Sequence, residues 1–356
     1  MSNLERLRAR MAESGVPALF VSDILNVRWL SGFTGSTAYC VVTTDHALFL
    51  TDSRYTIQAE QEVSKGFDIA TFGAPKSWHD HFSEAFAKAQ VKELMFETSA
   101  KYAQVDEWKS GFPDLGWHPA GSILSDLRMV KTPAEIAKIK AACQLADATM
   151  LHASQLLQPG RTELDVLLDL EFFIKRQGAK PAFDAIVVSG PNSARPHGKP
   201  GNRVIEIGDF VTLDLGAQLD GYNSDITRTF VAGHASDRHR EVYEQVLKAE
   251  LESISFMKPG VSGKEVDARA REVLDEKGLA KHFGHGLGHG LGLAVHDYGG
   301  LNTRSTDILE PGNVYTVEPG VYIEGFGGCR IEDDVVVTSD GVEVLTHFPR
   351  ELILVP

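Results

Sequence analysis

The sequence predicts an α+β domain, in which helices cover a curved antiparallel sheet, preceded by a smaller α/β domain. Three observations predict this arrangement. Helix-like and strand-like segments alternate over about the first 125 residues, a strong helix-start signal follows near residue 132, and the remaining chain alternates pairs of helices with hairpin-like runs. The 356 residues are enough for two domains that each bury a core.

The first part of the chain has the alternation expected of a small α/β domain. LERLRARMAES (4–14) has the apolar spacing of an amphipathic helix, and SEAFAKAQ (83–90) has the same character. PALFVSD (17–23) and AYCVVTTDHALFLTD (38–52) are rich in β-branched and aromatic residues and predict strands.

A helix-start signal indicates where the second domain begins. Thr132 is placed to cap a helix, Pro133 suits the first helical position, and Glu135 completes a capping box. We therefore predict one domain over residues 1–128 and a second over 129–356.

Four helices and several strands are expected in the second domain. The helices are predicted from Thr132 to about Leu157, between Thr162 and Gln177, from about Asp237 to Lys258, and from Gly263 to Lys277. The strand-like runs are AFDAIVVSG (182–190), FVTLDLGAQLDGYNSDITRTFVAG (210–233), VYTVEPGVYI (314–323) and CRIEDDVVVT (329–338). Helix pair, hairpin, helix pair, hairpin is the order that indicates helices packed over a sheet.

The first hairpin places two aspartates on one face of the sheet. Asp220-Gly221 between alternating apolar runs is typical of a two-residue loop. With that loop, Asp214 lies opposite Thr227 and diagonal to Asp225, about 7–8 Å away between backbones. Two carboxylates can converge on a metal ion from there. An aspartate that only caps or solvates a strand remains the alternative at this point.

A second hairpin brings two glutamates together. Glu318 and Glu332 flank the loop EGFGG (324–328), and their midpoint falls on Gly325, so a simple hairpin places them opposite each other. Pro319 leaves that register open, because proline cannot donate to the ladder and often accompanies a bulge. Two like charges facing each other in an apolar sheet are costly unless a cation lies between them.

Three histidines lie in the glycine-rich run FGHGLGHGLGLAVHD (283–297): His285, His289 and His296. The spacing of the first two matches the HExxH motif, but the glycines disfavour a helix and the motif's glutamate is missing. A phosphate loop is also disfavoured, because no Lys-Ser/Thr follows. In a strand, that spacing puts both rings on one face, and glycine lets another backbone or a ligand approach closely.

The composition excludes several classes of function and site. With 35 basic and 49 acidic residues the formal net charge is −14, which disfavours nucleic acid as a partner. No apolar run is long enough to span a membrane, and a cytoplasmic location is expected. Cys40, Cys143 and Cys329 lack the spacing of a thiolate zinc site. A bound metal would therefore have histidine and carboxylate ligands, as manganese, cobalt, iron or zinc accept.

The ordered frames LDLGA, SDITRTF, GHGLGLAVHD, TVEPG and RIEDD resemble the pita-bread metallopeptidases of the M24 type, which include methionine aminopeptidase, aminopeptidase P and prolidase. The resemblance covers about residues 130–356. NVRWLSGFTGS (26–36) and FLTDSRY (49–55) resemble the creatinase-like N-terminal domain of aminopeptidase P and prolidase, which methionine aminopeptidases lack. The resemblance therefore implies the Xaa-Pro peptidase branch.

The resemblance implies two divalent ions per subunit, with manganese expected first and cobalt or zinc as alternatives. It implies that Asp214 chelates one ion, that His289 and Glu318 bind the other, and that Asp225 and Glu332 bridge both. It also implies that a metal-bridging water or hydroxide attacks the scissile carbonyl, which two cations would favour by lowering the pKa of that water.

Further roles follow from the same resemblance. Glu318 would move a proton from the nucleophile to the leaving proline nitrogen. His197 and His296 would hydrogen-bond the scissile amide and the developing oxyanion. His285 and Arg330 would line the proline pocket and support the bridging glutamate. A surface or core role stays the alternative for these last four residues.

The activity expected first is that of an Xaa-Pro aminopeptidase, which acts on peptides with proline at position 2, and the enzyme is expected to be a homodimer. An Xaa-Pro dipeptidase, or prolidase, is the alternative. A creatinase-like amidinohydrolase does not require the five ligands, and a non-catalytic pita-bread binding module would have lost them, so both are disfavoured. Cys329 is expected to be a buried, inert thiol, and Arg54 to face a partner's site or pair within its own domain.

Overall fold

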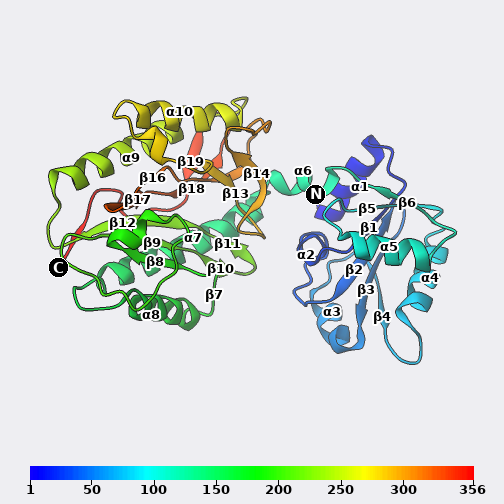
Figure 1. The fold of residues 1–356 in the computed structure, drawn as a ribbon. Coiled ribbons are helices and arrows are strands. Elements are labelled where there is room, and N and C mark those ends of the chain that lie inside the picture. The colour runs from blue at the N-terminus through cyan, green and yellow to red at the C-terminus, as the bar shows by residue number, and fades with distance from the viewer. The chain divides into compact units, whose positions relative to one another are not determined.

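The structure is a computed structural model that describes residues 1–356. The chain divides into two compact units, Met1–Arg128 and Met129–Pro356, which Figure 1 shows as ribbons. We propose these units as the two domains. No helix combines the length and the apolar character that crossing a membrane requires.

The N-terminal unit is built on a six-stranded sheet with the strand order β4-β3-β2-β1-β5-β6. The strands are β1 (Ala18–Val21), β2 (Ala38–Thr43), β3 (Ala47–Asp52), β4 (Asp68–Phe72), β5 (Glu93–Phe96) and β6 (Gly116–Pro119). The helices are α1 (Asn3–Glu13), α2 (Ile24–Ser31), α3 (Thr56–Glu62), α4 (Trp78–Lys88), α5 (Tyr102–Gly111) and α6 (Ile123–Met129). Antiparallel pairs join β1, β2 and β3, whereas parallel pairs add β4, β5 and β6. The predicted small α/β domain is confirmed.

The C-terminal unit contains four long helices, and each begins at a capping box. They are α7 (Pro133–Ser154), α8 (Glu163–Arg176), α9 (Asp237–Phe256) and α10 (Gly263–Asp275). The side-chain oxygens of Thr132, Thr162, Ser236 and Ser262 accept the exposed N–H groups at the four starts. The four predicted helices are therefore confirmed, and they end within a turn of the predicted limits.

The strands of this unit form two large sheets and two small ribbons. The large sheets have the orders β20-β12-β9-β8 and β14-β13-β15-β18-β19, and the ribbons are β11-β10-β7 and β16-β17. Their bounds are β7 (Lys180–Pro181), β8 (Ile186–Ser189), β9 (Phe210–Leu215), β10 (Ala217–Leu219), β11 (Tyr222–Asn223), β12 (Ile226–Ala232), β13 (Gly288–Gly290), β14 (Asp297–Leu301), β15 (Val314–Val317), β16 (Gly320–Ile323), β17 (Gly327–Arg330), β18 (Asp333–Val337), β19 (Val342–Val344) and β20 (Leu354–Val355). The pairing is antiparallel, as predicted, except that β20 returns beside β12 in parallel.

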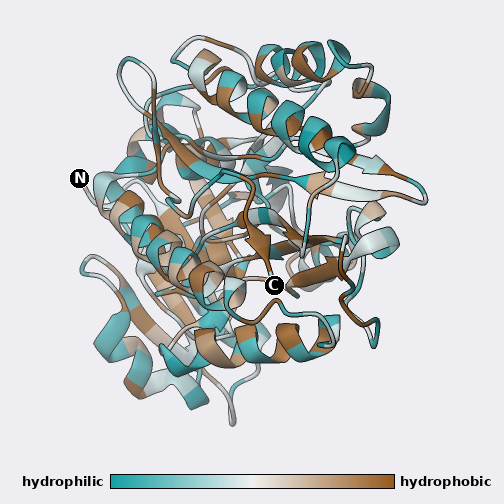
Figure 2. Cartoon of the chain, turned by 90° about the vertical axis from the view of Figure 1, so that its left-hand side faces the viewer, coloured by the Kyte–Doolittle hydropathy of each residue, from teal (hydrophilic) through white to brown (hydrophobic).

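Apolar residues between the helices and the sheets hold this unit together. One buried cluster joins α9 and α10 to β15, β16 and β18, and a second joins α7 and α8 to β8, β9 and β12. Figure 2 shows the same pattern by hydropathy, with teal and brown residues alternating along the helices and several inner strands brown along their length. Burying the brown face of each helix against a sheet is what fixes the positions of the strands.

The first hairpin has the predicted register. Asp220 and Gly221 both have positive φ, 49° and 82°, as a two-residue loop of the I′ type requires. Asp214 on β9 pairs with Thr227 on β12, and Asp225 directly precedes that strand. The prediction that the two aspartates share one face of this hairpin is confirmed.

The second hairpin also keeps its register across the proline. Val317 pairs with Asp333 between β15 and β18, and Gly320 pairs with Arg330 between β16 and β17. Both pairs are centred on Gly325, so Pro319 interrupts the ladder without shifting it. Glu318 and Glu332 therefore lie opposite each other in the interruption, as predicted.

A bridge between the two hairpins brings the four carboxylates into one place. Glu332 pairs with Thr227 outside the regular strands, and its N–H donates to the Thr227 carbonyl at 3.1 Å. Because Thr227 is also the partner of Asp214, the two hairpins meet where their acidic residues lie.

Candidate active site

A pocket of about 950 Å³ in the C-terminal unit is lined by all nine residues that the sequence marks as candidates. These residues are His197, Asp214, Asp225, His285, His289, His296, Glu318, Arg330 and Glu332. Three of them lie on β9, β13 and β17 and the other six in the segments between strands, so residues more than 100 positions apart meet in one cavity.

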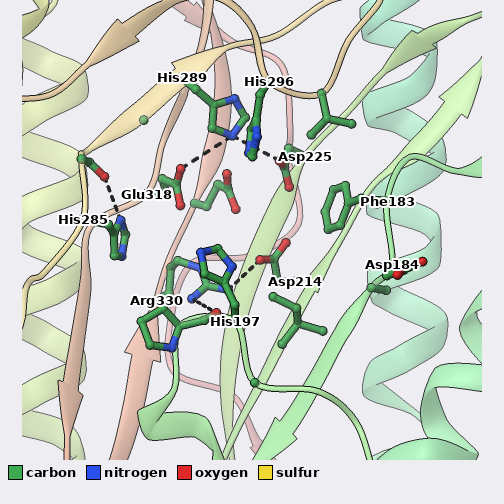
Figure 3. Close-up of a pocket in the computed structure, with 18 of the residues that line it drawn as sticks. Phe183, Asp184, His197, Asp214, Asp225, His285, His289, His296, Glu318 and Arg330 are labelled. Atoms are coloured by element: carbon green, nitrogen blue, oxygen red, sulfur yellow. Dashed lines mark hydrogen bonds and ion pairs between the residues drawn. The ribbon is translucent and has the colours of Figure 1, made fainter. Parts of the chain in front are cut away.

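The acidic residues and one histidine converge at the centre of this pocket. Figure 3 shows Asp214, Asp225, Glu318 and His289 pointing toward a common space. His289 Nε2 lies 3.6 Å from Asp225 Oδ2 and 3.7 Å from Glu318 Oε1. Asp225, His289 and Glu332 each offer one ligand atom, and these atoms lie within 4.8 Å of one another. Separations of this size leave room for a cation between the groups.

The ring of His289 is oriented with one nitrogen toward the carboxylates. Its Nδ1 contacts the Gly290 carbonyl at 3.1 Å, and a carbonyl can only accept. Nδ1 therefore carries the proton, and the lone pair of Nε2 faces the pocket. Burial lowers the pKa of His289 to about 4, which keeps the ring neutral, the form that binds metals.

The carboxylates repel one another in the absence of a cation. Burial, followed by the charge of Glu332, raises the pKa of the Asp225 and Glu318 carboxyls well above the ordinary value. Burial and the charge of Asp214 do the same to the pKa of Glu332. Such a group of buried acids is costly when ionised, and a bound cation removes that cost.

Unpaired oxygens show that the cluster fits divalent metal ions. Asp214 Oδ1 and Asp225 Oδ1 are buried and have no hydrogen-bond partner. A buried carboxylate oxygen without a partner is rare, because the lost hydration is not replaced. Oxygen ligands combined with one imidazole are the donor set that manganese, cobalt and zinc accept. The residues present therefore fit the expected ions.

The other oxygens of the cluster are held by neighbouring side chains. Thr227 Oγ1 donates to Glu332 Oε2 at 2.6 Å, and Arg330 Nη2 donates to Asp214 Oδ2 at 2.6 Å. Asp334 Oδ2 accepts from the Asp225 N–H at 2.9 Å. The first two contacts orient the carboxylates of Glu332 and Asp214, and the third holds the backbone of Asp225.

Arg330 and His285 belong to one hydrogen-bonded chain beneath the carboxylates. Arg330 is only 3% exposed, and its Nη1 donates to the Tyr322 hydroxyl at 2.7 Å. That hydroxyl contacts His285 Nε2 at 2.9 Å, while His285 Nδ1 contacts the Gly286 carbonyl at 2.8 Å. Burial lowers the pKa of His285 to about 4. Both nitrogens of this neutral ring are engaged within the protein, so His285 offers the pocket the faces and edges of its ring.

His197 and His296 are placed differently. His296 lies in the loop after β13, and its ring packs against that of His289 with centroids 4.2 Å apart. His197 is exposed on the loop between β8 and β9 and lies on the opposite side of the carboxylates in Figure 3. The two rings therefore flank the acidic cluster and face the space that a substrate would occupy.

The glycines of the histidine-rich run make room for neighbouring strands. A Cβ on Gly288 would lie 1.9 Å from the Thr316 carbonyl oxygen, and one on Gly290 would lie 1.9 Å from that of Tyr298. The predicted close approach is thus filled by the protein's own backbone. Of the three histidines, strand β13 contains only His289, and the pairing with β14 shifts its register between His289 and Gly290. His285 therefore precedes the strand, and the expectation of both rings on one continuous strand is wrong.

The sequence did not single out several residues that line the pocket. Phe183, Lys199, Asn302 and Arg304 all do so. Lys199 and Arg304 are exposed cations in loops where the sequence shows only turn-forming residues. Their role depends on how the two loops fold back over the sheet, and no local motif indicates that.

The structure also shows the surroundings of Arg54 and Cys329. Arg54 donates to Asp52 from both Nε and Nη2, at 2.9 and 2.7 Å, so it pairs within its own unit. Cys329 is fully buried, and burial raises the pKa of its thiol to about 12, which leaves it inert at neutral pH.

Comparisons with known proteins agree with this site. The model of metallopeptidase family M24 matches residues 137–339, and that of the creatinase/prolidase N-terminal domain matches residues 3–130. The first match covers more than half of the chain and contains every residue of the acidic cluster.

Individual relatives match the whole chain. The structure of an Xaa-Pro dipeptidase from Bacillus anthracis is 41% identical, superposes with a TM-score of 0.95, and covers 99% of each chain. An Xaa-Pro dipeptidase from Pyrococcus furiosus is 36% identical over 98% of this chain and 99% of its own. The structure of an X-Pro aminopeptidase from Thermotoga maritima is 36% identical, with a TM-score of 0.90, and covers 96% of this chain and 98% of its own.

Proposed function

The chain belongs to metallopeptidase family M24, and from that premise we propose that it is an Xaa-Pro dipeptidase, which hydrolyses the bond before the proline of a dipeptide. The sequence favoured an aminopeptidase acting on longer peptides. The relatives favour the alternative, because dipeptidases predominate among those matched over the whole chain. Cleavage of longer peptides is the second candidate function, because one of the similar structures is an X-Pro aminopeptidase from Thermotoga maritima.

The observation that carries the proposal is that two basic side chains line the same pocket as the acidic cluster. Lys199 and Arg304 line the pocket that also holds the acidic cluster. A dipeptide has a free carboxylate one residue from the scissile bond, and cations recognise such a group. In a longer peptide this position is an uncharged amide, which cations bind less well.

The acidic cluster would hold two divalent ions. We propose Asp225 and Glu332 as the bridging ligands, Asp214 as a ligand of one ion, and His289 Nε2 with Glu318 as ligands of the other. When bound, such ions polarise the scissile carbonyl and make water acidic enough to attack it at neutral pH. Manganese is the proposed metal, because carboxylate oxygens are most of the donors.

The chain's own groups would orient the peptide and move the proton. A carboxyl oxygen of Glu318 takes a proton from the attacking water and delivers it to the proline nitrogen as the C–N bond breaks. The rings of His197 and His296 donate hydrogen bonds to the substrate's amide and to its developing oxyanion. Arg330 keeps Asp214 in place and so preserves the position of its free oxygen.

The length of the accepted peptide tests the proposal directly. Metal-stripped protein is incubated with Ala-Pro and with Ala-Pro-Ala, with Mn²⁺, Co²⁺ or Zn²⁺ added in turn, and the released alanine is measured. We expect turnover of the dipeptide, fastest with Mn²⁺. Efficient cleavage of the tripeptide would move the assignment to an aminopeptidase. Inactivity toward both peptides with all three metals would refute both activities.

Removing the positive charges of Lys199 and Arg304 should weaken binding of the substrate's carboxylate. In the double variant Lys199→Met, Arg304→Met, we expect KM for Ala-Pro to rise about tenfold, which corresponds to about 1.4 kcal/mol of lost binding. Ala-Pro amide, measured as a substrate or a competing ligand, has no charge at that end and serves as the control. An equal loss of affinity for Ala-Pro and for Ala-Pro amide would show that these two side chains do not bind the carboxylate.

We further propose that the enzyme is a cytoplasmic homodimer. Cys40, Cys143 and Cys329 are buried free thiols, as is usual in a reducing compartment. The outer face of α8 carries Leu164, Leu168 and Phe172, which are 36%, 57% and 55% exposed and would be covered at a subunit interface. Light scattering of the purified enzyme measures the subunit number.

A further inference from the structure

We infer that Glu163 is a positioning residue, which holds the base of the loop that carries His197 and so sets how readily the pocket accepts a peptide. The loop comprises residues 189–201 and is called the His197 loop below. The inference rests on the proposed function, because it takes the peptide to bind in the pocket that His197 lines. Glu163 itself does not line that pocket.

The carboxylate of Glu163 is fully buried and accepts four hydrogen bonds, all from the His197 loop. Oε1 accepts from the Ser189 N–H at 2.7 Å and from the Ser189 hydroxyl at 2.9 Å. Oε2 accepts from Asn192 Nδ2 at 3.0 Å and from the Gly201 N–H at 3.2 Å. The side chain has 0% exposure, so water cannot replace these donors.

These contacts join the two ends of the loop to one point. Ser189 is the last residue of β8 and Gly201 is the last residue of the loop, and a single carboxylate binds both. Glu163 is the first residue of α8, a helix of 14 residues packed against the sheet. Both ends of the loop are thus fixed to a rigid helix, and one of them, Gly201, is four residues after His197.

Asn192 links Glu163 to the turn around His197, which is the tip of the loop. Besides donating to Glu163, its Nδ2 donates to the Lys199 carbonyl at 3.4 Å. Its own carbonyl accepts from the Arg195 N–H at 3.1 Å, and the Arg195 carbonyl accepts from the Gly198 N–H at 2.9 Å. The turn around His197 is therefore built on the residue that Glu163 holds.

On the pocket side, fewer hydrogen bonds reach the loop from other elements, although its segment Gly190–Ala194 packs against β17. Arg330 Nη1 reaches the Pro196 carbonyl at 3.4 Å, and Ser193 Oγ accepts from the Gly328 N–H at 2.8 Å. His197 and Lys199 are exposed. The position of the tip depends for this reason on how firmly its base is held.

Replacing Glu163 by glutamine keeps the size of the side chain but removes one acceptor oxygen, which takes two of the four hydrogen bonds. The carboxylate offers acceptors only, whereas the amide nitrogen of glutamine would face donors from the loop. Two buried donors would then lose their partner, which favours a loosened base. If the ordered loop is populated about a tenth of the time, KM rises about tenfold while kcat at saturation changes little, because bound peptide selects the ordered form.

Three variants test the inference with Ala-Pro as substrate and manganese-loaded enzyme. Glu163→Gln is expected to raise KM about tenfold with kcat within about twofold of the wild type, and Asn192→Ala to raise KM by a smaller factor. Asp165→Asn is the matched control, since Asp165 caps the same helix through Thr162 and makes no contact with the loop. Its KM should equal that of the wild type.

A second readout does not depend on activity. Amide hydrogen exchange over residues 189–201 should be faster in Glu163→Gln and Asn192→Ala than in the wild type and in Asp165→Asn. This comparison stands even if the wild type cleaves no Xaa-Pro peptide, so a failed function and a failed inference are distinguishable. Unchanged exchange in both loop variants, or KM values equal to that of the control, would overturn the inference.

Discussion

Asp225→Asn is expected to lower kcat/KM for Ala-Pro by about a thousandfold or more, since losing the carboxylate that we propose as a bridging ligand removes several kcal/mol of transition-state stabilisation. The Asp225 carboxylate lies 3.6 Å from His289 Nε2, and one of its oxygens has no partner in the protein. Asparagine has almost the same shape, so the fold should persist while the negative charge is lost. Turnover of Ala-Pro and the number of bound metal ions per subunit are the measurements.

Asp184→Asn is the control for this variant. Asp184 lines the same pocket but is exposed, and in Figure 3 it points away from the acidic cluster. It should retain most of the turnover and the full metal content. Near-normal turnover in Asp225→Asn would refute its assignment as a metal ligand, whatever the fate of the control.

Metal-free enzyme is expected to lose stability as the pH rises, and divalent metal is expected to restore it. Asp225, Glu318 and Glu332 have raised pKa values in the folded chain, first because of burial. An acid with a raised folded pKa holds its proton where the unfolded chain has lost it. Its contribution to stability is therefore complete below the ordinary carboxyl pKa and disappears as the pH rises through the raised value.

Thermal unfolding of metal-stripped protein between about pH 5 and pH 8, with and without saturating Mn²⁺, measures this effect. The gain in Tm from Mn²⁺ should be larger at the higher pH, since the cation replaces the missing protons. The variant Glu332→Gln removes one of the buried acids and should flatten the dependence. A gain from Mn²⁺ that is equal at both ends of the range, or larger in acid, would contradict the account.

The sequence predicts the geometry of the site wherever short-range rules decide it. The Asp220-Gly221 loop determines which residue faces Asp214, and the symmetry around Gly325 determines which residue faces Glu318. In both hairpins the register follows from the turn alone. The four helices are equally predictable, because each capping box indicates its own start.

What the sequence does not predict depends on contacts between distant segments. The bridge from Thr227 to Glu332 joins residues 105 positions apart, and no pattern in either strand indicates it. The placement of Lys199 and Arg304 at the pocket likewise follows from loop packing. We propose that a preference for a dipeptide over a longer peptide depends on such residues. The sequence favoured the other activity because its N-terminal motifs, NVRWLSGFTGS and FLTDSRY, look more like those of the aminopeptidase P branch.

The continuous register across Pro319 has a consequence for insertions and deletions. Side chains alternate between the faces of a strand with a period of two, so a residue added within the turn at 324–326 that shifted the pairing by one position would turn Glu332 away from the pocket. The apolar residues of β18 would change faces at the same time, and the core would be lost along with the site. Changes of length in this turn are therefore tolerated only when they leave the pairing of β15 with β18 intact, which makes chain length here as constrained as residue identity.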